Sequence, residues 1–411
     1  MPSNLDIQQH LENESIPVAP LGLIVLPSAK DLGEKINQRL VRLRSNSRHK
    51  NSDTPEYMDY YKEDYRMDFS IPRFFNGEGR AQLNESARGR DIYILTDITN
   101  HSLTYEMNGF TNHMSPDDHF QDLKRVIAAI NGRAHRITVI MPFLYEGRQH
   151  GRSGRESLDA AQMLKELTDL GIDNFITFDA HDPRIQNVSP LLEFDNFTTP
   201  YQFLRSLRHS VDDLIVDKDH IVVISPDEGA LDRTVYFANV IGADTGMFYK
   251  RRDYSRIEGG KNPIVAHEFL GTDLNGKDAI IIDDMISSGG SILDTSRQLK
   301  QNMHAKRVFL CTTFGLFTDG LEPFDEAYEK GYFDMMVTTN LTYQPPELMD
   351  KPYFALADMS QYTAMIIDFM NHDAPLSHIV TPTDKFHEVL EKFNRNETTE
   401  MEDRTLEETE I

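Results

Sequence analysis

The sequence contains very little cysteine, with one residue, Cys311, among 411. One thiol can form neither an intrachain disulfide nor a metal site made of cysteines, so both are excluded as sources of stability. Basic residues are also scarce, because 42 Lys and Arg stand against 66 Asp and Glu, for a formal net charge of −24. This charge argues against binding to nucleic acid or to an anionic membrane surface, and an anionic substrate would need local basic clusters.

The chain also lacks any apolar run close to the roughly 20 residues that a membrane-spanning helix requires. Its first residues show no basic segment followed by an apolar stretch, so no secretory signal is predicted. Together with the single cysteine, these features predict a cytoplasmic protein. Its length allows two or three domains of ordinary size, each with its own core.

Short apolar runs recur along the chain and alternate with longer amphipathic stretches. The runs predict strands at 22–26, 91–95, 137–141, 175–178, 221–224, 279–282, 308–312 and 335–337. The amphipathic stretches predict helices at 118–130, 156–170, 231–240 and 291–301. Such alternation is typical of an α/β fold with mainly parallel sheets, and two units of similar make-up fit the length, divided near 185–190.

Polar segments interrupt this pattern in three places. Residues 44–72 carry many charges and several tyrosines, which predicts a surface insertion with some aromatic packing. Residues 103–117 predict a second loop insertion. The tail at 395–411 is rich in Glu and Thr and is predicted to be disordered.

Residues 279–293, AIIIDDMISSGGSIL, are the most informative part of the sequence. An apolar strand ends at Asp283 and Asp284, whose carboxylates can hold sugar hydroxyls. Small residues follow at 287–291, and their backbone N–H groups can wrap a phosphate at the start of a helix. The segment resembles the phosphoribosyl-diphosphate (PRPP) binding signature of type I phosphoribosyltransferases and of ribose-phosphate pyrophosphokinases, the PRPP synthetases.

Two further strand ends carry polar side chains. The segment SPDEG places Asp227 after an apolar run, where a helix cap and a metal ligand are both open readings. The segment FDAHDPRIQ places Asp179, His181 and Asp182 at another strand end, where oxygens and an imidazole could engage a magnesium-bound nucleotide. A structural histidine is the alternative there.

Basic side chains cluster twice in this acidic chain. Arg148, Arg152 and Arg155 follow one predicted strand, and the sequence KRR at 250–252 follows the apolar GMFY. Arginine suits polyphosphate because its guanidinium presents a planar fork of donors. A solvated basic loop remains the alternative for the first cluster.

The motifs FNGE, LNESARGRDIYIL, GRQHGR, FDAHDPRIQ, SPDEG, YKRRD and DDMISSGGS occur in the order and approximate spacing of a ribose-phosphate pyrophosphokinase. The resemblance spans roughly residues 20–382, whereas a plain phosphoribosyltransferase has only the last motif. It implies two tandem type I phosphoribosyltransferase-like domains with mainly parallel sheets, at 18–187 and 188–382, of which only the second binds ribose 5-phosphate. It also implies a homo-oligomer, hexameric or dimer-based.

The resemblance further implies roles for individual residues. An adjacent subunit would lend three residues that face the adenine of ATP, namely Phe74, Asn76 and Glu78. The other ATP-binding positions are Arg148, Gln149, His150 and His181. Magnesium would be engaged by His181 and Asp227. The catalytic loop would contribute Lys250 and Arg252. Ribose 5-phosphate would be bound by Asp283, Asp284, Ser287, Ser288, Gly289, Gly290 and Ser291.

The implied reaction transfers the β,γ-diphosphoryl group of MgATP to the anomeric hydroxyl of ribose 5-phosphate, giving PRPP and AMP. This sequence departs from the family pattern at Ser287, where an acid is usual, and at His150, where the family has Asp. The first change favours an alternative, a non-catalytic regulatory homologue, although Lys250 and Arg252 are retained. A phosphoribosyltransferase is a weaker alternative, because it leaves FNGE, GRQHGR and YKRRD unexplained.

Overall fold

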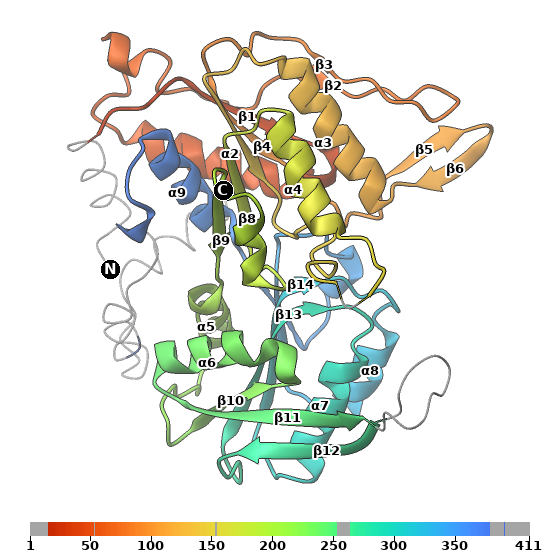
Figure 1. Cartoon of the computed structure of the whole chain (residues 1–411). Coiled ribbons are helices and arrows are strands. Elements are labelled where there is room, and N and C mark those ends of the chain that lie inside the picture. The colour runs from red at the N-terminus through yellow and green to blue at the C-terminus, as the bar shows by residue number, and fades with distance from the viewer. Residues whose placement is uncertain (1–14, 53, 153, 253–263, 379–389, 391–411) are drawn as a thin grey trace.

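A computed structural model describes residues 15–52, 54–152, 154–252, 264–378 and 390, so the acidic tail expected at 395–411 lies outside the described residues. The chain builds two large sheets, one in the upper half of Figure 1 and one in the lower half. Among the described residues, no helix combines the length and apolar character needed to cross a membrane.

The first sheet has five strands in the order β1-β4-β7-β8-β9, all parallel. Its strands are β1 (Leu21–Val25), β4 (Asp91–Leu95), β7 (Arg136–Ile140), β8 (Asn174–Phe178) and β9 (Glu193–Phe197). Helices α2 (Lys30–Ser45) and α9 (Ser360–Asn371) cover one face. Helices α3 (Pro116–Ile130) and α4 (Asp159–Asp169) cover the other, which gives three layers.

The second sheet has seven strands in the order β12-β11-β10-β13-β14-β15-β16, and only the β11–β12 pair is antiparallel. Its strands are β10 (Ile221–Ser225), β11 (Asp244–Arg252), β12 (Ile264–Gly271), β13 (Asp278–Ile286), β14 (Val308–Gly315), β15 (Met335–Thr339) and β16 (Phe354–Ala357). Helices α5 (Pro200–Ser210) and α6 (Leu231–Ile241) pack on one face. Helices α7 (Gly290–Gln301) and α8 (Glu322–Glu329) pack on the other.

The α/β fold with mainly parallel sheets is confirmed, and each predicted strand and helix is present with ends shifted by a few residues. The remaining elements are short. They are β2 (Phe69–Ser70), β3 (Gln82–Leu83), β5 (Thr104–Met107), β6 (Phe110–His113), η1 (Pro27–Ala29), η2 (Pro55–Tyr57), η3 (Pro183–Val188), η4 (Glu228–Ala230), η5 (Pro346–Leu348) and η6 (Leu376–His378).

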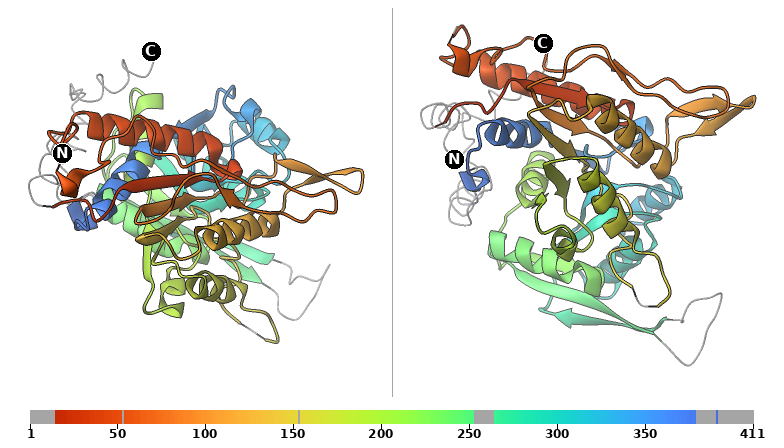
Figure 2. Two further views of the ribbon diagram at one scale, coloured as in Figure 1. Left: turned by 90° about the horizontal axis from the view of Figure 1, so that it is seen from above. Right: turned by 45° about the horizontal axis from the view of Figure 1, so that its top comes forward.

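Residues 103–117 differ from the loop expected there. They form the β5–β6 hairpin, which projects from the side of the molecule in Figures 1 and 2, and the first turn of α3. Asn108 and Gly109 turn the hairpin with φ of 54° and 82°. An Asn-Gly pair favours this type of turn because both of its central residues need positive φ. That dipeptide was the sequence signal for a hairpin.

The segment 44–72 packs along the outer edge of the first sheet. The N–H of Leu23 donates to the carbonyl of Tyr65, and the N–H of Met67 donates to the carbonyl of Leu23, both at 2.8 Å. Tyr60 and Tyr65, which belong to this segment, are buried. It therefore covers the free edge of β1, which would otherwise present unpaired backbone groups.

The two sheets do not divide the chain at the expected boundary of 187/188. Strand β9 follows that boundary but pairs with β8 in the first sheet. Helix α9 follows the last strand of the second sheet, yet it packs against α2 on the first sheet, and the two helices lie side by side in Figure 1. The C-terminal part of the chain thus returns to complete the core of the first sheet.

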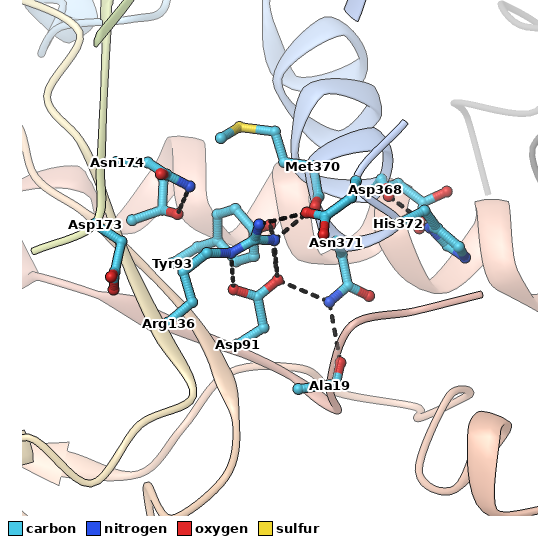
Figure 3. A network of polar contacts seen from close by, with 12 residues as sticks. Ala19, Asp91, Tyr93, Arg136, Asp173, Asn174, Asp368, Met370, Asn371 and His372 are labelled. Carbon is cyan, nitrogen blue, oxygen red and sulfur yellow. Dashed lines mark hydrogen bonds and ion pairs between the residues drawn. The ribbon is translucent and has the colours of Figure 1, made fainter. Parts of the chain in front are cut away.

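A buried polar network ties α9 to this sheet. The Arg44 guanidinium of α2 donates to Asp368 of α9 at 2.7 Å, and both side chains are 1% exposed. Asn371 donates to Asp91 of β4 at 2.8 Å, and Arg136 of β7 pairs with the same carboxylate at 2.8 Å (Figure 3). Each buried charge therefore has a partner of opposite sign, as a stable core requires.

We expect the substitution Arg44→Met to lower the free energy of unfolding by about 3 kcal/mol, because it leaves the carboxylate of Asp368 buried without its cation. The measurement is the urea midpoint of the purified protein. The control is Arg297→Met, which removes an exposed pair with Asp294 on α7 and should cost less than about 1 kcal/mol. Equal shifts in both variants would show that the buried pair does not hold α9 in place.

Candidate functional site

The site forms where the carboxyl ends of the two sheets meet. His181 follows β8 of the first sheet, and its Nδ1 lies 2.6 Å from Oδ2 of Asp284 on β13 of the second sheet. Asp179, at the end of β8, accepts a hydrogen bond from Thr199 at 2.8 Å and another from Thr313 of β14. Ligands bind at the carboxyl ends of strands in open parallel sheets, so this is the expected place for a site.

A cavity of about 270 Å³ opens at this junction. It brings together predicted residues from both halves of the chain with the loop that precedes α7. Its lining comprises Arg148, His181, Asp227, Gly229, Arg233, Asp283, Asp284, Met285, Ile286, Ser287, Ser288, Gly289, Gly290, Ser291 and Ile292. The seven predicted ribose-phosphate residues are therefore all found in one place.

The loop before α7 needs small residues for steric reasons. Gly289 has a φ of +83°, and a Cβ there would lie 2.3 Å from the ring of Phe324. At Gly290 the nearest atom to a Cβ would be Ser288 Oγ at 3.9 Å, so that position is open. The loop ends at the N-terminus of α7, where unpaired backbone N–H groups and the helix dipole favour an anion.

Asp283 and Asp284 have opposite protonation tendencies. Burial, together with the charge of Asp284, raises the pKa of Asp283 well above its usual range. Burial alone would raise the pKa of Asp284 as well, but the hydrogen bond with His181 and the charge of Arg233 outweigh it and lower that pKa to about 2. The pair can thus offer sugar hydroxyls both a proton donor and a carboxylate acceptor.

A second cavity of about 570 Å³ adjoins the first and shares His181, Arg233 and Asp283 with it. Asp179, Tyr236 and Phe203 contribute to its walls. Burial raises the pKa of the Asp179 carboxyl, which lies where the two sheets meet. The connected cavities provide room for more than one substrate.

The predicted nucleotide loop follows β7 and faces this junction. Arg148 lines the smaller cavity and lies against the sulfur of Met285, which brings a first-sheet cation to the second sheet. His150 lines the larger cavity, where its Nε2 is 3.1 Å from Asp182. Gln149 lines neither cavity, and its backbone N–H donates to Glu146 at 2.8 Å.

His150, at a position where the family resemblance implies Asp, has a local partner, Asp182. Hydrogen bonds from Arg184, reinforced by the charge of His150, lower the pKa of Asp182 to about 2. The His150 and His181 ring centroids are 5.7 Å apart. Both imidazoles therefore lie beside carboxylates, His150 beside Asp182 and His181 beside Asp284.

The residues expected to bind magnesium, His181 and Asp227, both line the smaller cavity. Within the described ranges, no group of three or more His, Cys, Asp or Glu could hold a metal by itself. Where substrate phosphates supply most of its ligands, magnesium needs only one or two groups from the protein. His181 would keep Nε2 for that role. Asp227 accepts a hydrogen bond from the Gly229 N–H at 3.0 Å and caps η4, as one of the two sequence readings expects.

The structure leaves two predicted groups apart from the cavities. Phe74, Asn76 and Glu78 form a turn in which the Phe74 N–H donates to the Glu78 carbonyl at 2.7 Å, and none of them lines either cavity. The backbones of Lys250 and Arg252 lie in strand β11, paired with β12, where a loop was expected, and their side chains are outside the described residues.

Arg233, Thr199 and Thr313 were missed by sequence reasoning. Arg233 lies on α6, six positions after Asp227, and looks like any charged helix residue. The threonines lie before α5 and within β14, where nothing in the local sequence distinguishes them from structural residues. Only the meeting of the two sheets places them beside Asp179.

The sequence is similar to those of known proteins. Residues 21–171 match the family model of the N-terminal domain of ribose phosphate pyrophosphokinase, and residues 201–344 match that of the phosphoribosyl transferase domain. A ribose-phosphate pyrophosphokinase of Corynebacterium efficiens is 30% identical over 278 residues, which are 67% of this chain and 76% of that protein. The chain belongs to the ribose-phosphate pyrophosphokinase family. The Aquifex aeolicus member is 28% identical over 277 residues, 66% of this chain and 78% of that protein.

A solved structure confirms the fold. The phosphoribosylpyrophosphate synthetase of Mycobacterium smegmatis matches with a TM-score of 0.65 at 22% identity, covering 86% of this chain and 99% of that one. The predicted architecture, two domains of the phosphoribosyltransferase type with mainly parallel sheets, is therefore confirmed for this member of the ribose-phosphate pyrophosphokinase family.

We expect Gly289→Ala to lower the free energy of unfolding by about 2 kcal/mol or more, because a Cβ is strained at this φ and overlaps Phe324. Gly290→Ala is the matched control and should change stability by less than about 0.5 kcal/mol. Urea unfolding of both variants is the measurement. If Gly289→Ala is as stable as the control, the loop is not held by Phe324.

Proposed function

We propose that this chain is an active ribose-phosphate pyrophosphokinase, which transfers the β,γ-diphosphoryl group of MgATP to the anomeric hydroxyl of ribose 5-phosphate. The strongest support for this proposal is the composition of the smaller cavity. The phosphate loop and carboxylate pair of the second sheet share a cavity with Arg148 and His181 of the first sheet. A sugar phosphate and a nucleoside polyphosphate can therefore meet there.

The sugar phosphate would be held by two features of the second sheet. The 5-phosphate would accept hydrogen bonds from the backbone N–H groups of 287–291 at the start of α7. Asp283 and Asp284 would hold ribose hydroxyls, one as a proton donor and the other as an acceptor. This fixes the anomeric oxygen for attack, so much of the catalytic advantage comes from positioning.

The reaction is a substitution at phosphorus. The anomeric oxygen forms a bond to the β-phosphorus, the bond from that phosphorus to the oxygen bridging it to the α-phosphorus breaks, and AMP leaves with the bridging oxygen. The hydroxyl proton passes to water. His181 and Arg148, which line this cavity, would hold the polyphosphate against this oxygen, and Lys250 and Arg252 are the proposed cations for the transferred group.

Magnesium is the proposed cofactor, held by substrate phosphates with His181 and Asp227. When bound, it supplies positive charge that offsets the negative charge of the polyphosphate. Phe74, Asn76 and Glu78, which line neither of the two cavities, would act on a neighbouring subunit's ATP. A homo-oligomer and a cytoplasmic location stay predictions.

The main alternative is a regulatory homologue that binds substrates without turnover. Ser287 favours it, because a carboxylate usual in the family is missing at that position. Its hydroxyl instead lies 3.5 Å from that of Thr318. The intact carboxylate pair and phosphate loop in the cavity favour the active enzyme.

Phosphorus NMR of purified protein with MgATP and ribose 5-phosphate tests this choice. We expect PRPP and AMP to appear in equal amounts, and we expect Lys250→Ala to abolish both, because the transferred group loses a cation in the transition state. Lys165→Ala, which removes an exposed pair with Asp169, is the control and should keep full activity.

Two outcomes would contradict the proposed function. A folded protein that binds ATP and ribose 5-phosphate but makes neither product would support the regulatory homologue. Release of pyrophosphate from PRPP in the presence of a nucleobase would support a phosphoribosyltransferase instead.

A further inference from the structure

Arg233 lies within the site, although the assigned roles leave it without a function. It is carried by α6, near the turn that contains Asp227, and its side chain is 17% exposed. It lines both cavities. Its Nη1 lies 3.4 Å from Oδ1 of Asp284. The guanidinium therefore sits in the wall that the two cavities share.

The guanidinium has hydrogen-bonding capacity left over. Nη1 is buried and has no hydrogen-bond partner among the residues that the structure describes. Its ion pair with Asp284 is longer than the roughly 2.7–2.9 Å of a charge-assisted hydrogen bond. Asp284 instead makes its short contact, 2.6 Å, with His181. A buried donor without an acceptor is destabilising, so an incoming oxygen atom would be favoured there.

The other groups of the site restrict what that oxygen can be. The backbone N–H groups of 287–291 already supply donors for the 5-phosphate, and Asp283 and Asp284 are suited to the sugar hydroxyls. A guanidinium binds anionic phosphate oxygens best, through its planar fork. The reaction contains one further anion that must cross from the nucleotide to the sugar, the diphosphoryl group.

We propose that Arg233 is a further catalytic residue, whose guanidinium binds an oxygen of the diphosphoryl group during its transfer. The inference rests on the proposed function and adds a residue to it. Arg233 supplies positive charge from the wall beside Asp284, while Arg148 supplies it from the first sheet. The group is held from two sides where negative charge accumulates in the transition state.

The test compares Arg233→Gln and Arg233→Lys with the wild type. For Arg233→Gln we expect kcat to fall about 100-fold, as for the loss of one preorganised donor, with the KM for ribose 5-phosphate changed less than about threefold. Arg233→Lys should recover part of kcat because it keeps the charge. Arg297→Gln, in an exposed pair on α7, is the matched control and should keep wild-type kinetics.

Two results would overturn the inference. One is an unchanged kcat in Arg233→Lys and Arg233→Gln. The other is a fall in kcat that is accompanied by an equally large fall in melting temperature or in affinity for ribose 5-phosphate. That result would indicate a structural role. Melting curves and calorimetric binding of ribose 5-phosphate are therefore measured for each variant.

Binding of magnesium pyrophosphate separates this inference from the proposed function. We expect calorimetry to show weaker binding to Arg233→Gln than to the wild type and to Arg297→Gln. If Arg233→Gln binds magnesium pyrophosphate more weakly but the wild type makes no PRPP, the proposed function is contradicted while Arg233 remains a diphosphate ligand. Equal binding with normal PRPP synthesis would contradict only the role of Arg233.

Discussion

The site depends on the contact between His181 and Asp284, because these residues come from different sheets. Each sheet alone carries half of what the proposed reaction needs. Asp179 reinforces the junction by accepting hydrogen bonds from Thr199 and Thr313. Polar contacts of this kind hold the two half-sites in register, because every buried donor and acceptor lost there would cost free energy.

Helix α9, which lies far along the chain, also supports this junction. Helix α9 follows the second sheet in sequence but completes the core of the first, where Arg44 and Asp368 form a buried pair. The returning helix therefore links the two sheets a second time. Two separate attachments restrict hinge motion more than a single crossover would, and this suits a site whose catalytic groups come from both sides.

Two features set this chain apart from the pattern that the family resemblance implies. His150 replaces an acid and pairs with Asp182 at the wall of the larger cavity. The hairpin β5–β6 supports the turn that carries Phe74, because the Asn108 N–H donates to the Phe75 carbonyl at 2.9 Å. Phe75 is 87% exposed beside it. The hairpin thus supports a turn that, in the proposed function, reaches the ATP of a neighbouring subunit.

The sequence by itself determined the α/β class, the strand that leads to Asp227, the strand that carries Asp283, and the phosphate loop with Gly289. It could do so because hydrophobic periodicity, residue size and backbone conformation are local properties. It could not place β9 within the first sheet or α9 against its face, since both depend on contacts between distant segments. Arg233 needed the tertiary structure for the same reason. Its role follows from a buried donor beside Asp284, and no local pattern shows which side chains will share a cavity.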